Sequence, residues 1–204
     1  MLRSKSTGFS LIELLITVAV LLVLVGFGVP SFISAIKDSR VDSIISRTIG
    51  SLYLARSEAV KRSSSVTVCA RATDTSCGSD WNNGWIVFVD NTQGGAAGTA
   101  GQLDANDEVL QTTEPLDKAF LSVTGSLAQD ASSASNSEKR DFIRYRPSGR
   151  NSWSGGTFAL CDDRGVEHAR VLHLVLTGDI RKGRTKNDET PEDVHGTAIV
   201  CPTL

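Results

Sequence analysis

The chain has 204 residues, of which 40% are hydrophobic and 22% charged, and its formal net charge is −2. This balance excludes a highly charged disordered chain and a strongly basic nucleic-acid-binding domain. The length is enough for one core of ordinary size, without a second domain. Eighteen glycines and five prolines indicate many turns around a β-rich core.

The N-terminal segment predicts a membrane anchor. Residues 1–8 are polar, and Arg3 and Lys5 are their only charges. The stretch Leu14–Ile36 has 23 residues and no charge, and a membrane span needs about 20 apolar residues. Basic residues ahead of such a run keep the N-terminus cytoplasmic. We therefore expect one span that carries one extracytoplasmic domain.

Glu13 bears on how this anchor is processed. No A-x-A site ends the apolar run, which favours an uncleaved signal anchor over a secretory signal. A carboxylate inside a membrane helix costs about 2.5–3.5 kcal/mol on insertion scales. Glu13 therefore lies either at the lipid headgroups or opposite the N-terminal amine of a neighbouring subunit. The second arrangement requires cleavage between Gly8 and Phe9.

One long helix is expected from about Phe9 to about Arg62, with its first half in the bilayer and its second half on the globular domain. The stripe that packs on this domain consists of Val41, Ile44, Ile45, Thr48, Ile49, Leu52, Ala55, Ala59 and Val60. Pro30 removes a helix hydrogen bond, and Gly26 and Gly28 weaken the preceding turn. We expect a kink or a locally melted segment there; the alternative is a gently bent, continuous helix.

Beyond the helix, the hydrophobic period changes to that of strands. The strongest candidate is Trp85–Asp90, which is rich in β-branched and aromatic residues. The other expected strands are Val66–Arg71, Glu108–Thr113, Ala119–Thr124, Asp141–Arg146, Gly156–Cys161, Arg170–Thr177 and Thr197–Cys201. No helical stripe separates them, which favours antiparallel sheets. Residues 93–101, 131–138 and 182–196 are typical of loops in composition.

The sequence contains no strong motif for a catalytic or metal-binding site. The three histidines show no short metal-ligand spacing, and no G-x-S-x-G elbow occurs. A calcium site with oxygen ligands from Asp90, Asp104, Asn106 and Asp107 is the alternative to a plain hairpin turn. We expect no enzyme activity, no cofactor and no metal.

The four cysteines argue for disulfides in an exported domain, because their number is even. They are Cys69, Cys77, Cys161 and Cys201. No C-x-x-C pair occurs, which disfavours zinc-ribbon and thioredoxin-like sites. The residues alone leave three pairings open.

The start of the chain resembles that of type IV prepilins and type II secretion pseudopilins. The resemblance is carried by KSTGFSLIELLITVAVLLVLVGFGVPSF, with Gly8 before the cut, Phe9 after it, Glu13, the apolar stretch and Pro30. It implies cleavage after Gly8 and N-methylation of Phe9 by a prepilin peptidase. It also implies that the apolar segment is retained and that Glu13 and Pro30 serve assembly.

The remainder resembles the FimT/FimU and GspH group of minor pilins and pseudopilins. The matching residues are Arg56, Glu58, Ala59, Gly84, Trp85, Phe88, Asp90, Glu108, Leu110, Phe158 and Cys161. The resemblance implies an α+β type IV pilin fold, with a long N-terminal helix packed on an antiparallel two-sheet β head. It divides the chain into a leader (1–8), a transmembrane assembly helix (9–36), an amphipathic second half (37–62) and a globular head (63–204). Together with nearness in sequence, it implies the pairs Cys69–Cys77 and Cys161–Cys201.

DNA binding is known for some members of this group, through a Gly-Arg-x-Arg pattern near the C-terminus. Here the pattern is replaced by Gly178-Asp179-Ile180-Arg181, and a carboxylate repels phosphates. Arg181, Lys182 and Arg184 remain the candidate DNA contacts, although the acidic residues beside them favour a solvated loop. Loss of the leader leaves 19 basic against 23 acidic side chains, so we expect weak DNA binding at most.

The resemblance as a whole implies a FimU-like minor type IV pilin in a priming or tip complex that initiates pilus assembly, for adhesion and twitching motility. The implied partners are other minor pilins, the major pilin, the prepilin peptidase and an inner-membrane assembly platform. The implied location is the bacterial inner membrane, single-pass with a periplasmic head, and later the pilus. An H-type pseudopilin of type II secretion and a DNA-binding minor pilin of DNA uptake are the alternatives.

Overall fold

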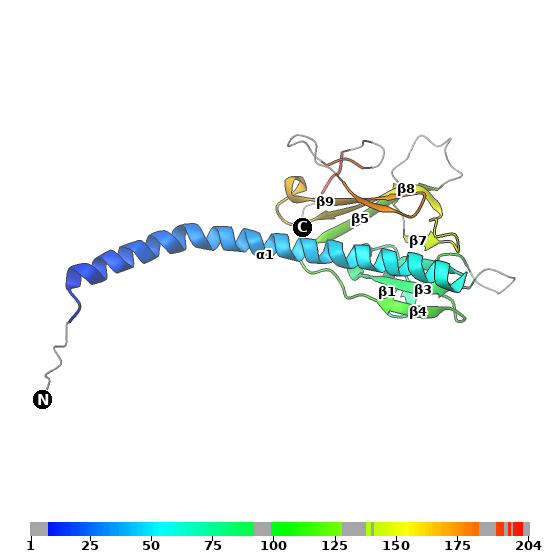
Figure 1. Cartoon of the computed structure of the whole chain (residues 1–204), viewed down its shortest axis with the longest axis horizontal. Helices are drawn as coiled ribbons and strands as arrows, with labels where there is room; N and C mark the ends of the chain where they lie inside the picture. Colours follow the sequence, from blue (N-terminus) through cyan, green and yellow to red (C-terminus); the bar gives the residue numbers. More distant parts are fainter. Residues whose placement is uncertain are drawn as a thin grey trace, which may run out of the picture. The chain divides into compact units, whose positions relative to one another are not determined.

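The computed structural model of the chain describes residues 8–91, 99–127, 138–139, 141–183, 191–193, 196 and 198–201. The chain divides into two units, Met1–Arg40 and Val41–Leu204. One helix, α1 (Leu11–Arg62), contributes to both units (Figure 1). Its bounds agree with the helix expected from the sequence to within two residues at the N-terminal end.

The first unit consists of the apolar part of α1. Its hydrophobic side chains face outwards, with Leu11 79% and Phe32 68% exposed. Among the described residues, α1 is the one helix that is long and apolar enough to cross a membrane. Ser10 starts the helix, because its carbonyl oxygen accepts the N–H groups of Glu13 and Leu14, both at 3.1 Å.

The helix continues without a break through the Gly26–Pro30 turn. The prediction of a locally melted segment is therefore wrong, because the helix is continuous here; a kink at this turn stays a prediction. The fixed φ of proline lies within the helical range, so Pro30 removes one hydrogen bond without forcing the backbone out of the helix.

The second half of α1 packs on the head along one stripe. Its buried residues are Val41, Ile44, Ile45, Thr48, Leu52, Ala55 and Ala59, as expected. Val60 is an exception, because it is 52% exposed; it follows Ala59 by one residue and so points about 100° away from it around the helix. The helix ends at Ser63, whose positive φ of 52° turns the chain out of the helix.

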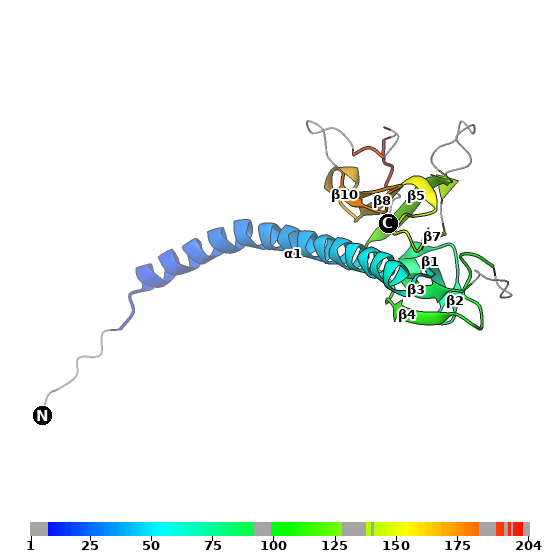
Figure 2. The same ribbon diagram turned by 45° about the vertical axis from the view of Figure 1, so that its right-hand side comes forward.

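Two antiparallel sheets form the head, which confirms the α+β class (Figures 1 and 2). The first sheet contains β1 (Ser65–Thr73), β2 (Ser76–Cys77), β3 (Trp85–Asp90), β4 (Glu108–Thr112) and β7 (Phe142–Tyr145). Its order is β2-β1-β3-β4, and β7 pairs with β1. The second sheet contains β5 (Phe120–Leu127), β6 (Glu138–Lys139), β8 (Trp153–Cys161), β9 (Arg170–Val175) and β10 (Ile180–Lys182), in the order β10-β9-β8-β5-β6.

Strand β3 shows why the first sheet is buried on both faces. Trp85, Val87 and Val89 belong to the main core with α1 and the second sheet. Ile86 and Phe88 point to the opposite face, where they form a smaller cluster with Cys69. This alternation is that of a strand, and it explains the nearly continuous apolar run in the sequence.

A 3₁₀ turn that was not predicted, η1 (Trp81–Asn83), lies between β2 and β3 of the first sheet and contacts the second sheet. The Trp81 ring meets the ring of Phe158 on β8 edge to face, with centroids 5.8 Å apart. The side-chain oxygen of Asn82 accepts the N–H of Leu121 on β5 at 2.8 Å. The turn therefore ties the start of β3 to the second sheet. A second short turn, η2 (Val166–His168), precedes β9.

One expected strand is absent from the described residues. In place of Thr197–Cys201, the structure has a single bridge between Glu192 and Ala198, and the backbone N–H of Ile199 donates to the Pro191 carbonyl at 2.9 Å. Within the described residues, these backbone contacts join the segment to Pro191 and Glu192, and none of its residues belongs to one of the strands β1–β10. The loops expected at 93–101 and 131–138 lie mostly outside the described residues.

Candidate functional site

The residues of the expected processing site lie at the exposed start of α1. Gly8 and Phe9 precede the helix, and Phe9 is exposed. Glu13 lies in the first helical turn, four residues after Phe9. Residues 1–7, including Arg3 and Lys5, lie outside the described part of the chain. The structure thus places a carboxylate within one turn of the position where cleavage would create an amine.

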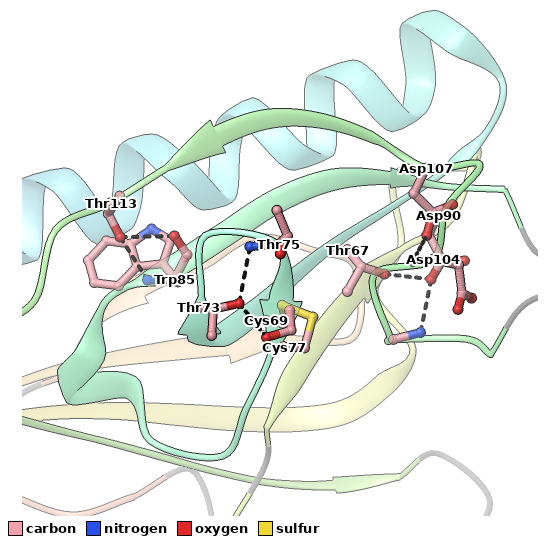
Figure 3. Close-up of a disulfide and its surroundings, with 12 residues drawn as sticks. Thr67, Cys69, Thr73, Thr75, Cys77, Trp85, Asp90, Asp104, Asp107 and Thr113 are labelled. Carbon is pink, nitrogen blue, oxygen red and sulfur yellow. Dashed lines mark hydrogen bonds between the residues drawn. A yellow bond between two sulfur atoms is a disulfide. The ribbon is translucent and has the colours of Figure 1, made fainter.

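Both disulfides implied by the resemblance are present. Cys69 on β1 bonds to Cys77 on β2, with Cα atoms 5.7 Å apart (Figure 3). Cys161, the last residue of β8, bonds to Cys201, with Cα atoms 5.8 Å apart. The first bridge closes the β1–β2 hairpin, and the second fastens the C-terminal segment to the second sheet.

The carboxylates considered for calcium accept hydrogen bonds within the described parts of the β3–β4 connection. Asp90 is fully buried, and it accepts the Thr67 hydroxyl at 2.8 Å and the Gly101 N–H at 3.0 Å (Figure 3). The Arg144 guanidinium lies 3.1 Å from the same carboxylate. Asp107 accepts the Asp104 N–H at 2.9 Å. Within the described residues, no group of three or more His, Cys, Asp or Glu side chains could hold a metal ion.

A buried polar chain attaches the second half of α1 to the first sheet. The Trp85 indole N–H donates to the Ser51 hydroxyl at 2.9 Å, and this hydroxyl donates to the Gln111 side chain at 3.0 Å. The Arg47 guanidinium lies 5.6 Å from the centre of the Trp85 ring. The sequence marks Trp85 as a core residue of a strand but contains no signal for these helix partners.

The basic cluster near the C-terminus contains an anchored carboxylate. The Arg56 guanidinium on α1 donates to Asp179 at 2.7 Å and to the Thr177 carbonyl oxygen at 3.0 Å. Gly178 has φ +84°, and a Cβ there would lie 2.3 Å from the Gly149 carbonyl oxygen, so only glycine fits this turn. Asp179 therefore joins the β9–β10 turn to α1.

The three candidate DNA contacts do not form one site within the described residues. Arg181 and Lys182 are exposed on β10. Lys182 lines a hollow beside Asp42 and Arg170, whereas Arg184 lies outside the described residues. The role of Asp179 was missed by sequence reasoning, because its partner is 123 residues away.

The Arg56 contact predicts a pH-dependent stability. The hydrogen bond from Arg56, supported by the Thr177 hydroxyl, holds the pKa of Asp179 below its ordinary value of 3.8. The stabilisation is therefore complete above pH 3.8 and is lost as the pH falls through the lowered pKa. Asp179→Asn should lower the melting temperature near pH 6 and have no effect in stronger acid. Thermal unfolding across this range checks it.

Glu114→Gln is the matched control for this measurement, because it also removes one carboxylate charge and Glu114 is exposed. It should leave the melting temperature unchanged at both pH values. If the melting temperature of the Asp179→Asn protein stays below that of wild type by the same amount in strong acid, the ion pair does not have this role.

The face of α1 that points away from the core carries small and apolar side chains. Its exposed members, at alternating spacings of three and four residues, are Ser43, Ser46, Gly50, Tyr53, Ser57 and Val60. Tyr53 is 48% exposed, and a Cβ added to Gly50 would meet nothing within 4 Å. Alternation of three and four is the spacing of a helix–helix seam.

Comparison with known proteins places the chain in a family. Residues 45–179 match the family described as type II transport protein GspH, and residues 3–29 match the prokaryotic N-terminal methylation motif. No curated protein matches the sequence.

Two crystal structures of the type IV minor pilin FimU from Pseudomonas aeruginosa (strain PAO1) are similar at 17% identity. One has a TM-score of 0.48 and covers 76% of this chain and 94% of that chain; the other has a TM-score of 0.44 and covers 75% and 94%. The GspH match spans well over half of the chain, from the second half of α1 to the β9–β10 turn, and the methylation motif precedes it. The chain therefore belongs to the GspH family, and it carries the N-terminal methylation motif ahead of the GspH match.

Proposed function

We propose that this protein is a FimU-like minor type IV pilin, a structural subunit of a priming or tip complex that initiates pilus assembly. The observation that carries the proposal is an exposed apolar helix with one carboxylate in its first turn, continuous with a disulfide-bonded head. Four cysteines, one of them close to the C-terminus, favour the pilus-type member over the secretion pseudopilin.

Its chemistry is assembly rather than turnover. The prepilin peptidase cuts after Gly8 and methylates Phe9, and the new amine then meets the Glu13 carboxylate of a neighbouring subunit. Such a pair removes the cost of an isolated charge in an apolar phase. The exposed seam from Ser43 to Val60 supports the same proposal, because small side chains let a second helix approach closely.

The partners follow from this role. They are other minor pilins, the major pilin and the inner-membrane assembly platform. The protein spans the inner membrane once, with its head in the periplasm, and moves into the pilus on assembly. Nucleic acid is not a proposed partner, because the carboxylate of Asp179 is held in the basic cluster by Arg56.

Deletion of the gene separates a minor pilin from its main alternative. We expect loss of surface pili and of twitching motility, with protein secretion unchanged and recovery on complementation. Normal twitching together with a secretion defect would instead identify an H-type pseudopilin.

The proposal predicts a specific cut between Gly8 and Phe9. N-terminal sequencing of the membrane-bound protein should begin at Phe9, and intact mass should show one added methyl group. Gly8→Val should remain uncut while its head folds, because a Cβ at Gly8 meets nothing within 4 Å. A mature protein that retains Arg3 and Lys5, or begins elsewhere, contradicts the assignment.

A further inference from the structure

The charged side chains on the second half of α1 are paired, with one exception. The paired ones form salt bridges with described residues of the helix or the head; they are Asp42, Arg56, Glu58, Lys61 and Arg62. Arg47 is the exception, because it has no carboxylate partner among the described residues. Its Nε atom is buried and has no hydrogen-bond partner there. An arginine is rarely buried in this way unless it is paired.

The Arg47 guanidinium is held in place by the ring of Trp85. It lies 5.6 Å from the ring centre. This ring is fixed, because Trp85 is only 1% exposed and its indole N–H donates to the Ser51 hydroxyl. The same hydroxyl donates to the side-chain oxygen of Gln111, whose amide nitrogen is a further donor. The site therefore presents N–H donors on a rigid support, and a guanidinium binds a carboxylate through two parallel hydrogen bonds.

An apolar hollow adjoins Arg47 on the outer face of α1. Its volume is about 690 Å³, and its lining residues are Gly50, Tyr53, Leu54, Arg56, Ser57, Val60 and Lys61. Gly50 follows Arg47 by three residues and Leu54 follows Gly50 by four, so the three lie side by side along the helix. Tyr53 is 48% exposed and Val60 is 52% exposed. This surface thus combines outward-facing apolar side chains with an unpaired cation at its edge.

We propose that Arg47 is the recognition residue of a helix-docking surface, which we define as Arg47 together with the residues that line this hollow. The occupant is a helix of a different pilin-type subunit, and it carries an Asp or Glu side chain opposite Arg47. The carboxylate supplies the anion that Arg47 lacks, and the apolar side of the helix fills the hollow. The inference rests on the proposed function in one respect, that the partner is another pilin-type subunit.

The charges select this partner over two others. A second copy of the chain offers Arg47 no unengaged carboxylate from the same half of α1, because Asp42 and Glu58 are in ion pairs. Two copies would also oppose Arg47 to the cations Arg56 and Lys61 that line the hollow, and such repulsion acts against a partner. A nucleic acid is disfavoured because its binding depends on several cations that neutralise phosphates, whereas this surface has one unpaired cation.

Photo-crosslinking of the full chain in cells of the native host tests the docking surface. The probe is p-benzoylphenylalanine in place of Tyr53, which keeps an aromatic ring in the hollow. We expect an adduct with another protein, mapped by mass spectrometry to a helical segment that contains an Asp or Glu. Arg47→Glu should lower the yield of this adduct about ten-fold or more, because it opposes two like charges in an interface. Changing one carboxylate of the mapped segment to lysine should restore the adduct of the Arg47→Glu chain.

Two further variants separate the charge of Arg47 from its packing. Arg47→Lys keeps the charge and should retain more of the adduct than Arg47→Gln, which keeps a polar side chain without the charge. Arg150→Glu is the matched control, because Arg150 is an exposed cation of the head outside α1, and it should leave the yield unchanged. Arg47→Lys and Arg47→Gln also cover the case in which Arg47→Glu does not fold.

An adduct that is unchanged by Arg47→Glu overturns the inference. So does the absence of a protein adduct, or an adduct confined to lipid, to nucleic acid or to a second copy of this chain. The proposed function fails separately: an Arg47-dependent adduct with a subunit of the type II secretion system would refute the minor pilin assignment and leave the carboxylate contact in place.

Discussion

Replacing Glu13 with alanine is expected to abolish recovery of the protein with sheared pili while the head remains folded. The carboxylate belongs to the first unit of the chain, Met1–Arg40, and the buried core belongs to the second. Two opposite charges about 4 Å apart attract by about 4 kcal/mol at an effective dielectric constant of 20. In the assembly step proposed above, alanine leaves the Phe9 amine without this partner and removes the charge pair that would align an incoming subunit.

Co-purification with sheared pili, compared with wild type, measures this effect. Glu13→Gln is the control for shape, because it keeps the side chain's size and loses its charge, and it should fail as alanine does. Membrane insertion and cleavage should stay normal in both variants. Equal recovery of mutant and wild type would show that Glu13 is not an assembly contact.

Replacing Phe158 with alanine is expected to cost about 3–5 kcal/mol of the free energy of unfolding, the range for a buried aromatic residue. Phe158 on β8 is fully buried, and it packs edge to face on Trp81 of η1. The change opens a cavity where the two sheets meet, and it removes the aromatic pair as well.

Urea unfolding of the full chain in micelles checks this value. Val109→Ala on β4 is the control, because Val109 is 43% exposed and its loss should change the free energy of unfolding by less than about 0.5 kcal/mol. Similar losses for the two variants would contradict the central position of Phe158 in the core.

The elements that could be predicted are those whose pattern is local. The β3 strand matches its expected bounds because both of its faces are buried, and the second half of α1 follows its stripe from Val41 to Ala59. Thr197–Cys201 also has a strand-like composition, but its described residues, 198–201, bond to Pro191 and Glu192 and, through Cys201, to Cys161. Short strands such as β10 depend on a partner strand's register, which a single segment does not encode.

The head's polar contacts were beyond prediction for a related reason. In the sequence, Asp179 is one charge in a mixed cluster. Its partner, Arg56, is distant in the chain and lies beside it only in the folded head. Likewise, the tie between Trp85 and Ser51 joins a strand to a helix across 34 residues. Side-chain type predicts that such groups need partners, but the partner emerges only from the packed fold.

The unbroken helix also has a mechanical consequence. In the filament role proposed above, a pull on a subunit enters the head through the part of α1 that packs in the main core, from Val41 to Ala59. Because the contacts of this stripe are spread along the helix axis, tension parallel to that axis loads them in shear, all at once, instead of peeling them apart one after another. The Arg56 tie to the β9–β10 turn shares the same load. The head is therefore built to resist axial force better than a sideways pull on α1.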